Sequence, residues 1–207
     1  MAVSVSLITV CFNAAQTIER CIQSVLRQSY PHLQYIVIDG ASTDGSINII
    51  KRYEEQISLF HSGKDNGPYD AMNKGLALAT GDVVGFLHAD DQLADAETLS
   101  RIASVFASRP ETDAVYGDLN FYDAQGKCVR RWQSSVFTPE KMRFGWMPAH
   151  PTFYMKQGLY EDEGGFFDGF GSAADYELML RYLHTRKIAA QYLPGEMVKM
   201  QTGGISN

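Results

Sequence analysis

The stretch 82–91, Asp-Val-Val-Gly-Phe-Leu-His-Ala-Asp-Asp, constrains the fold of this chain more than any other. Its apolar run, 83–87, is typical of a short buried strand. Two adjacent carboxylates, Asp90 and Asp91, follow that run. Ligand sites in open parallel α/β sheets lie outside the carboxyl ends of strands, and carboxylates there suit a hard cation such as Mg²⁺ or Mn²⁺. The alternative is that Asp91 or Asp95 caps the next helix.

The first 118 residues alternate between strand and helix patterns. Apolar residues at Ile18, Cys21, Ile22 and Val25, for example, have the spacing of one helix face. Such patterns predict strands at 3–11, 33–38, 57–61, 83–87 and 114–118, and helices at 14–27, 46–53, 69–79 and 97–106. This alternation at short spacing predicts an α/β fold with a mostly parallel, Rossmann-like sheet flanked by helices.

The pattern changes after about residue 120. Aromatic residues, glycines and prolines are frequent in 121–170, so we expect a small antiparallel edge there, with loops over one face of the sheet. A last helix is predicted at 174–184, a final strand at 189–193, and a tail at 198–207.

Composition excludes several classes of protein. With 207 residues and 45% hydrophobic residues, the chain is expected to form one domain. A net charge of -6 without a basic run disfavours nucleic-acid binding. No apolar stretch is long enough to span a membrane, and no signal peptide is recognisable. Three cysteines without metal-ligand spacing fit a reducing cytoplasm, so we expect a cytoplasmic protein.

Three predicted strand ends carry polar or acidic clusters, at 9–13, 39–44 and 90–91. Three clusters in one sheet favour a common site over three separate helix caps. The glycine-rich motifs of dinucleotide-binding and P-loop proteins are absent from the sequence. A nucleotide would therefore be held through its base and ribose, with its diphosphate on a metal at Asp90 and Asp91.

Five segments resemble, in the same order, the motifs of the inverting glycosyltransferases of family 2, which have the GT-A fold. They are 6–13 (Ser-Leu-Ile-Thr-Val-Cys-Phe-Asn), 37–45 (Val-Ile-Asp-Gly-Ala-Ser-Thr-Asp-Gly), 65–75, 81–91 and 174–178 (Ala-Asp-Tyr-Glu-Leu). Singly these patterns are weak, but five in the correct order are specific. The resemblance covers essentially the whole chain and is closest in character to bacterial surface-polysaccharide transferases.

The resemblance implies a role for each matching residue. Asp39 would hydrogen-bond the base of a nucleotide sugar, and the donor pocket as a whole would involve Thr9, Cys11, Asn13, Asp39, Asp65 and Asn73. Asp90, with Asp91 beside it, would hold the metal, Mn²⁺ or Mg²⁺. Asp175 would be the general base.

Two positions depart from the family pattern. His88 stands where many members have the first aspartate of Asp-x-Asp, and it either faces the sugar or fills space. Ala174 replaces the common glutamate before the base. His150 and Trp146 precede the base-bearing helix, so they are either packing residues or, with His88, contacts for acceptor or phosphate.

These features predict a metal-dependent inverting transferase that moves a sugar from a nucleotide sugar, by default a UDP-sugar, to a hydroxyl. The resemblance implies a carbohydrate or lipid-linked acceptor, a role in polysaccharide or glycolipid biosynthesis, and peripheral association with the inner face of the cytoplasmic membrane. Residues 1–118 would bind the donor and 119–207 would carry the acceptor site and base. Family members usually continue further, so we expect a natural chain that extends past Asn207.

Two alternatives stay open at this stage. A nucleotidyltransferase would share the sheet, the acidic strand ends and the metal. It should also carry a glycine-rich basic loop near its N-terminus, which residues 10–17 do not supply. The other alternative is a catalytically inactive nucleotide-sugar-binding module, which the departures at His88 and Ala174 would suit.

Overall fold

The computed structural model describes residues 2–142, 144–167 and 169–202. Its strands are β1 (Val5–Cys11), β2 (Leu33–Asp39), β3 (Leu59–Ser62), β4 (Val83–His88), β5 (Asp91–Leu93), β6 (Ala114–Tyr122), β7 (Cys128–Trp132), β8 (Tyr154–Lys156) and β9 (Ala190–Gln201). Its α-helices are α1 (Ile18–Leu26), α2 (Ser46–Lys51), α3 (Pro68–Leu78), α4 (Thr98–Ser108), α5 (Pro139–Met142), α6 (Gln157–Glu163) and α7 (Ala174–Met179). Short turns of other helix types are η1 (Glu54–Gln56), η2 (His150–Thr152), η3 (Gly171–Ala173) and η4 (Leu180–Thr185), the last with π-helical bonding.

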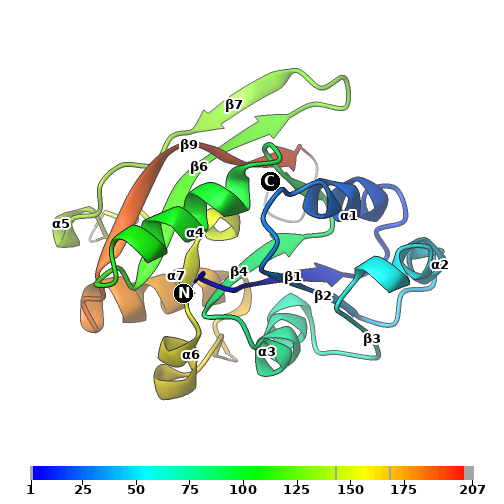
Figure 1. Cartoon of the computed structure of the whole chain (residues 1–207), viewed down its shortest axis with the longest axis horizontal. Coiled ribbons are helices and arrows are strands. Elements are labelled where there is room, and N and C mark those ends of the chain that lie inside the picture. The colour runs from blue at the N-terminus through cyan, green and yellow to red at the C-terminus, as the bar shows by residue number, and fades with distance from the viewer. Residues whose placement is uncertain (1, 143, 168, 203–207) are drawn as a thin grey trace.

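These strands form one sheet in the order β3-β2-β1-β4-β8-β6-β9-β5, and β7 pairs with β6 (Figure 1). The four strands β3, β2, β1 and β4 are mutually parallel. β8 lies antiparallel between β4 and β6, while β9 runs parallel to β6. The predicted α/β fold, with a parallel first half and antiparallel pairing in the second, is confirmed.

Helices cover both faces of the sheet because its central strands are apolar on both faces. Every residue of β1 is buried. Leu7 of β1 belongs to a core with α1, α2 and α4, while its neighbour Ile8 belongs to a core with α3, α6 and α7. A strand buried on both faces reads as a continuous apolar run, which is why the first strand was recognisable from sequence.

Close approach of α3 to the sheet depends on Gly75. A Cβ atom built at Gly75 would lie 2.4 Å from the side chain of Ile8 in β1, so a larger residue would push the helix away. α3 begins with Pro68 in its first turn, where the missing N–H costs no hydrogen bond. The start of α3 is thereby fixed at the carboxyl edge of the sheet.

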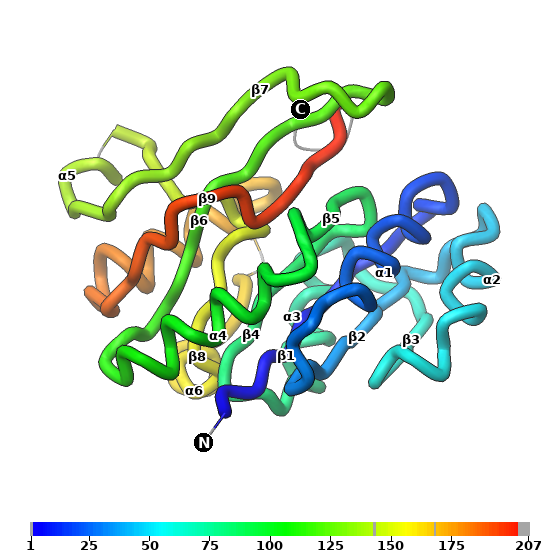
Figure 2. The backbone as a smooth tube through the Cα atoms, turned by 45° about the horizontal axis from the view of Figure 1, so that its top comes forward, coloured from blue at the N-terminus to red at the C-terminus, as the bar shows by residue number. Residues whose placement is uncertain are grey.

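Some elements were predicted incompletely or not at all. β9 extends through 190–201, twice as far as the predicted strand, and it includes part of the predicted tail. β5 and α6 occupy stretches without a predicted element. Figure 2 shows β9 beside β6. At the end of β9, Gln201 Oε1 accepts a hydrogen bond from the Arg20 guanidinium of α1 at 2.8 Å. Residues 203–207 of the predicted tail lie outside the described residues.

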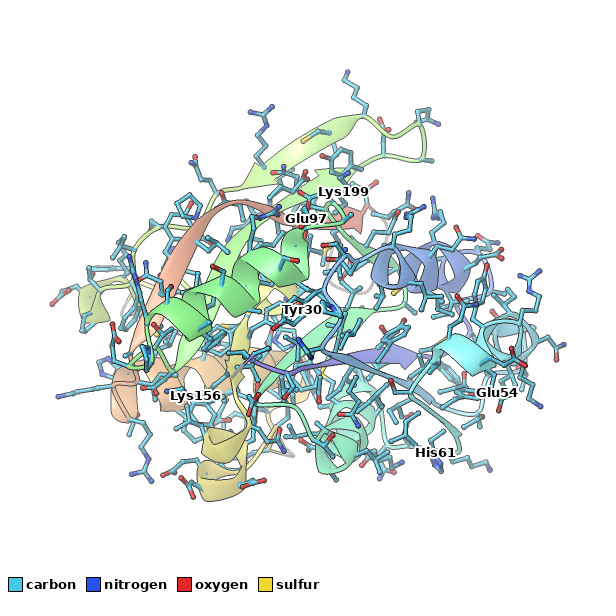
Figure 3. The ribbon with its side chains drawn as sticks, viewed as in Figure 1. Tyr30, Glu54, His61, Glu97, Lys156 and Lys199 are labelled. Carbon is cyan, nitrogen blue, oxygen red and sulfur yellow. The ribbon has the colours of Figure 1, made fainter. Side chains whose placement is uncertain are left out.

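Two labelled side chains in Figure 3 tie loops to the sheet. Nζ of Lys156 donates to the Pro110 carbonyl oxygen at 2.9 Å and to Asp113 Oδ1 at 3.1 Å, which joins β8 to the loop before β6. The Tyr30 hydroxyl donates to the carbonyl oxygen of Val3, ahead of β1. Within the described ranges, no helix combines the length and apolar character needed to cross a bilayer.

Candidate active site at the carboxyl edge of the sheet

The carboxyl ends of β1, β2 and β4 meet at one edge. Strand register places Cys11 of β1 beside Asp39 of β2, and Val10 beside His88 of β4. Two cavities open there, of about 760 Å³ and 650 Å³. We call them the first and second pockets. His88 and Asp90 line both, so the two pockets meet at the end of β4.

In addition to His88, four of the predicted site residues line the first pocket, namely Cys11, Asn13, Asp65 and Asp90. Asn13 has a left-handed backbone, with φ of 48°. Its side-chain oxygen accepts from the Thr43 N–H at 2.9 Å, and its own N–H donates to Ser42 Oγ at 2.8 Å. These bonds join the turn after β1 to the turn after β2, so the wall of the pocket is fixed before any ligand enters.

Two carboxylates of the first pocket, Asp44 and Asp65, accept hydrogen bonds from backbone N–H groups. Asp44 Oδ2 accepts from the Ala15 N–H at 2.9 Å, and hydrogen bonds from Ser46 lower the pKa of Asp44. A Cβ atom at Gly40 would lie 2.6 Å from Asp65 Oδ2. Gly40 therefore leaves room for the Asp65 carboxylate at the pocket wall, where Asp65 Oδ1 also accepts from the Gly67 N–H.

Asp39 lies directly behind this wall. Its side chain is fully buried, and Oδ2 accepts from the Ser42 N–H at 3.0 Å and from the Ser62 hydroxyl at 2.7 Å. Oδ1 meets no donor in the described part of the chain. Oδ2 of Asp39 therefore orders the turn after β2, and Oδ1 can accept a hydrogen bond from a ligand. Contact with a nucleotide base stays a prediction.

Besides Asp39, two more residues predicted for the donor pocket, Thr9 and Asn73, line neither cavity in the described part of the chain. Thr9 is fully buried on the α1 side of β1, where its hydroxyl accepts from Tyr35 Oη at 3.2 Å. Asn73 Nδ2 donates to the Phe166 carbonyl oxygen at 2.8 Å, and Asn73 Oδ1 accepts from the Phe166 N–H at 2.9 Å. Thr9 thus faces the helix layer, and Asn73 clamps the loop before α7.

Asp90 and Asp91 differ in their surroundings. Asp90 is half-buried and lines both pockets, while Asp91 is fully buried beneath the second. Neither carboxylate oxygen of Asp91 has a hydrogen-bond donor among the described residues. Burial, and then the charge of Asp90, raise the pKa of Asp91 well above its usual range. A cation bound here would remove both penalties.

The donor set fits a cation that is shared with a substrate. No group of three or more His, Cys, Asp or Glu side chains in the described residues could hold a metal by itself. Mg²⁺ is typically bound by one or two carboxylates together with substrate phosphates and water, rather than by an all-protein cage. The buried, unpartnered Asp91 next to the accessible Asp90 suits that arrangement.

The second pocket combines ionisable and apolar walls. Its ionisable lining residues are Asp90, Asp91, Asp175, His88 and His150. Its apolar lining comes largely from β6, β7 and β9, with Leu119, Phe121, Trp132, Met147 and Met200. A sugar presents both hydroxyl groups and apolar ring faces, and this pocket offers partners for both.

Asp175 lies at the start of α7 and is half-buried. Burial raises the pKa of Asp175, and the Tyr176 N–H, the nearby Tyr69 hydroxyl and His88 partly oppose that rise. The Tyr69 hydroxyl donates to the Ser172 carbonyl oxygen at 3.2 Å. The Tyr176 N–H lies 2.8 Å from Asp175 Oδ1. Burial and the charge of Asp175 raise the pKa of Tyr69 to about 12, so Tyr69 remains a hydrogen-bond donor. A carboxylate with a raised pKa in a pocket is suited to act as a proton acceptor.

The tryptophan in the second pocket is Trp132 of β7, and not the predicted Trp146. Trp146 packs against Phe137 and Tyr116, with ring centroids 6.1 Å apart in each pair. Sequence position suggested Trp146 because it lies in a loop before the base, but the neighbouring Met147 takes the pocket position. Tyr69, Trp132, Gln201 and Thr202 also line the pockets and were missed, because they come from elements far apart in sequence.

The geometry agrees with comparisons to known proteins. Residues 6–174 match the sequence profile described as Glycosyl transferase family 2. The chain belongs to this family. A "PGL/p-HBAD biosynthesis glycosyltransferase" from Mycobacterium bovis is 29% identical over 98% of this chain and 78% of its own length.

Solved structures show the same GT-A fold. S. aureus TarS in complex with UDP-GlcNAc has a TM-score of 0.77 and 22% identity over 97% of this chain. A mannosyltransferase from Pyrobaculum calidifontis in complex with GDP-Man and Mn²⁺ has a TM-score of 0.73 and 22% identity over 96% of this chain. The chain spans 59% of the TarS chain and 57% of the mannosyltransferase chain.

Proposed function

We propose that this family 2 domain transfers a sugar from a nucleotide sugar to an acceptor hydroxyl with inversion, assisted by a divalent cation. The observation that carries the proposal is that the second pocket joins the first at Asp90 and also contains Asp175. It holds Asp175, a half-buried carboxylate with a raised pKa, together with Asp90, which also lines the first pocket. A leaving group at Asp90 and a base at Asp175 would then lie on either side of one sugar.

The donor would occupy both pockets. Its nucleotide would lie in the first pocket among Cys11, Asn13 and Asp65, with Asp39 available to the base through its unpartnered oxygen. Its diphosphate would lie at Asp90, where both pockets meet. The first pocket is formed mainly by residues before 118, with Gln201 and Thr202 of the C-terminal half closing it. This supports a donor-binding half, 1–118, and an acceptor half, 119–207.

In the reaction, Asp175 would accept the proton of the acceptor hydroxyl as that oxygen attacks the anomeric carbon opposite the nucleotide. The Tyr176 N–H would hold the carboxylate in position, and the Tyr69 hydroxyl lies near it. Asp90 and Asp91 would hold Mn²⁺ or Mg²⁺, which supplies positive charge for the leaving diphosphate. A single displacement of this kind inverts the anomeric configuration.

The acceptor side favours a sugar with an apolar aglycone. Phe121 and Trp132 line the second pocket, and the exposed Arg130 guanidinium lies 5.0 Å and 5.8 Å from their rings. An apolar wall with a cation at its rim fits a carbohydrate joined to a lipid, and this supports a role in polysaccharide or glycolipid biosynthesis at the cytoplasmic membrane face. Transfer to octyl glycosides should then exceed transfer to the free sugars.

Turnover of donors tests the proposal directly. The protein should release UDP or GDP from at least one of UDP-glucose, UDP-GlcNAc and GDP-mannose when Mn²⁺ is present, and much less with EDTA. Nuclear magnetic resonance of the transfer product should show the opposite anomeric configuration to that of the donor. Release of pyrophosphate from a nucleoside triphosphate and a sugar phosphate would instead indicate a nucleotidyltransferase, and binding without any turnover an inactive module.

A further inference from the structure

His150 is a buried residue whose polar atoms lack partners. It lies in the turn η2, is 7% exposed, and lines the second pocket. Both ring nitrogens are buried without a hydrogen-bond partner among the residues that the structure describes. Unpaired buried polar atoms cost stability, so a ligand that satisfies them offers a physical reason for a histidine here.

The ring is held in place from several sides. Phe86 stacks on it with centroids 5.9 Å apart, and Phe166 meets it edge-on at 5.6 Å. The ring of His88 lies 5.8 Å away. The turn itself is fixed by Thr152, whose hydroxyl donates to the Ala149 carbonyl oxygen at 2.7 Å. Because the ring is packed on these sides, its position in the wall of the pocket is fixed.

The chemistry of the ring selects its ligand. Burial, and then repulsion from His88, lower the pKa of His150 to about 3. The imidazole is therefore neutral near pH 7, with one nitrogen that donates and one that accepts. A phosphate oxygen accepts hydrogen bonds, whereas a sugar hydroxyl both donates and accepts. A neutral imidazole is matched to hydroxyl groups.

Position separates the donor sugar from the acceptor. His88 and Asp90 mark the junction of the two pockets, and His150 is next to His88. A sugar that follows the diphosphate out of the first pocket first reaches the part of the second pocket beside His88 and His150, while the apolar wall from β6, β7 and β9 is left for the acceptor. We propose that His150 binds a hydroxyl group of the donor sugar and contributes to donor selectivity. This inference rests on the proposed function.

Tyr154 provides a matched control. Its hydroxyl is also buried and unpartnered in the described structure, and its side chain is fully buried. Tyr154 is not among the described residues that line the two pockets. His150→Phe and Tyr154→Phe each remove unpartnered polar atoms and keep an aromatic ring. Both variants should therefore melt at the same temperature as the wild type or higher, but only His150→Phe should weaken sugar binding.

The experiment is calorimetry with Mn²⁺, in which UDP is compared with UDP-glucose and UDP-GlcNAc, and GDP with GDP-mannose. For the sugar nucleotide that the wild type binds, His150→Phe should weaken affinity at least tenfold and leave the parent nucleotide within twofold. His150→Gln, which keeps a donor and an acceptor, should recover part of the loss. Tyr154→Phe should bind both ligands as the wild type does.

Three results would overturn the inference. They are unchanged sugar-nucleotide affinity in His150→Phe, an equal loss for the parent nucleotide, or an equal loss in Tyr154→Phe. If His150→Phe does not fold, His150→Gln decides, because it should then bind the sugar nucleotide more tightly than His150→Ala does. Failure of the proposed function looks different, since the wild type itself would then bind none of the nucleotides or turn none of them over.

Discussion

Replacement of Asp175 by asparagine tests the proposed base most directly. The asparagine side chain has the same shape, and its oxygen can still accept from the Tyr176 N–H, which lies 2.8 Å from Asp175 Oδ1. What is lost is basicity. General-base assistance is typically worth about 10² to 10⁴ in rate, which is about 2.7 to 5.4 kcal/mol of transition-state stabilisation. We expect sugar transfer to fall by at least ~10².

Donor binding and stability should respond differently from the rate. Donor affinity should stay within about threefold of wild type, or ~0.7 kcal/mol, because Asp175 faces the acceptor side. Burial raises the pKa of Asp175 in the folded state. Because this pKa is raised on folding, protonated Asp175 contributes stability at low pH, and that contribution is lost as pH rises through the pKa of the folded state. At pH 7 the neutral variant should therefore be at least as stable as the wild type.

The assay follows transfer of radiolabelled sugar to membrane extract or to octyl glycosides over a range of pH. Because the base acts when deprotonated, wild-type transfer should fall with decreasing pH, with a midpoint above the usual aspartate value of about 3.9. Asp175→Asn should lose this dependence. The control is Asp162→Asn, which changes an exposed aspartate of α6. Near-normal transfer by Asp175→Asn would refute the assignment and direct attention to Glu177.

Three further outcomes follow from the site. Asn73→Ala should lower the free energy of unfolding by about 2 kcal/mol, since it removes two half-buried hydrogen bonds to the backbone of Phe166, while UDP affinity measured by calorimetry stays unchanged. Asp39→Ala should lower both the melting temperature and UDP affinity, because Asp39 holds the turn after β2 through Ser42 and Ser62; an unchanged melting temperature would contradict this structural role. Asp90→Asn should weaken UDP binding in Mn²⁺ but not in EDTA, and equal wild-type affinity in both buffers would exclude a metal contribution.

Local pattern was sufficient for much of the first half of the chain. Helix periodicity at Ile18, Cys21, Ile22 and Val25 predicted α1, where all four side chains are buried. Apolar runs predicted β1, β2 and β4 because those strands are covered on both faces. The polar ends of these strands were predicted to meet, and they do so because parallel strands share one carboxyl edge. Family membership rested on the same segments.

Side-chain direction and distant partners were decided by the tertiary structure. Thr9 and Val10 are neighbours in a buried strand, and sequence does not tell which faces the pocket; the pleat turns Thr9 toward α1. Asn73 binds the backbone of Phe166, 93 residues away. β9 was predicted too short because its outer part is stabilised by pairing with β6 and β5 rather than by its own composition.

The sequence by itself therefore determined the class of fold, the family and the edge at which the chemistry is located. These depend on hydrophobic period and on residue types at strand ends, both of which are local properties. The tertiary structure decided which carboxylates are buried without partners among the described residues, which tryptophan lines the pocket, and that His150 lines it with both ring nitrogens buried and unpaired in the described part of the chain. Burial and hydrogen bonding depend on atoms from segments far apart in the chain, so they exist only once those segments have packed together.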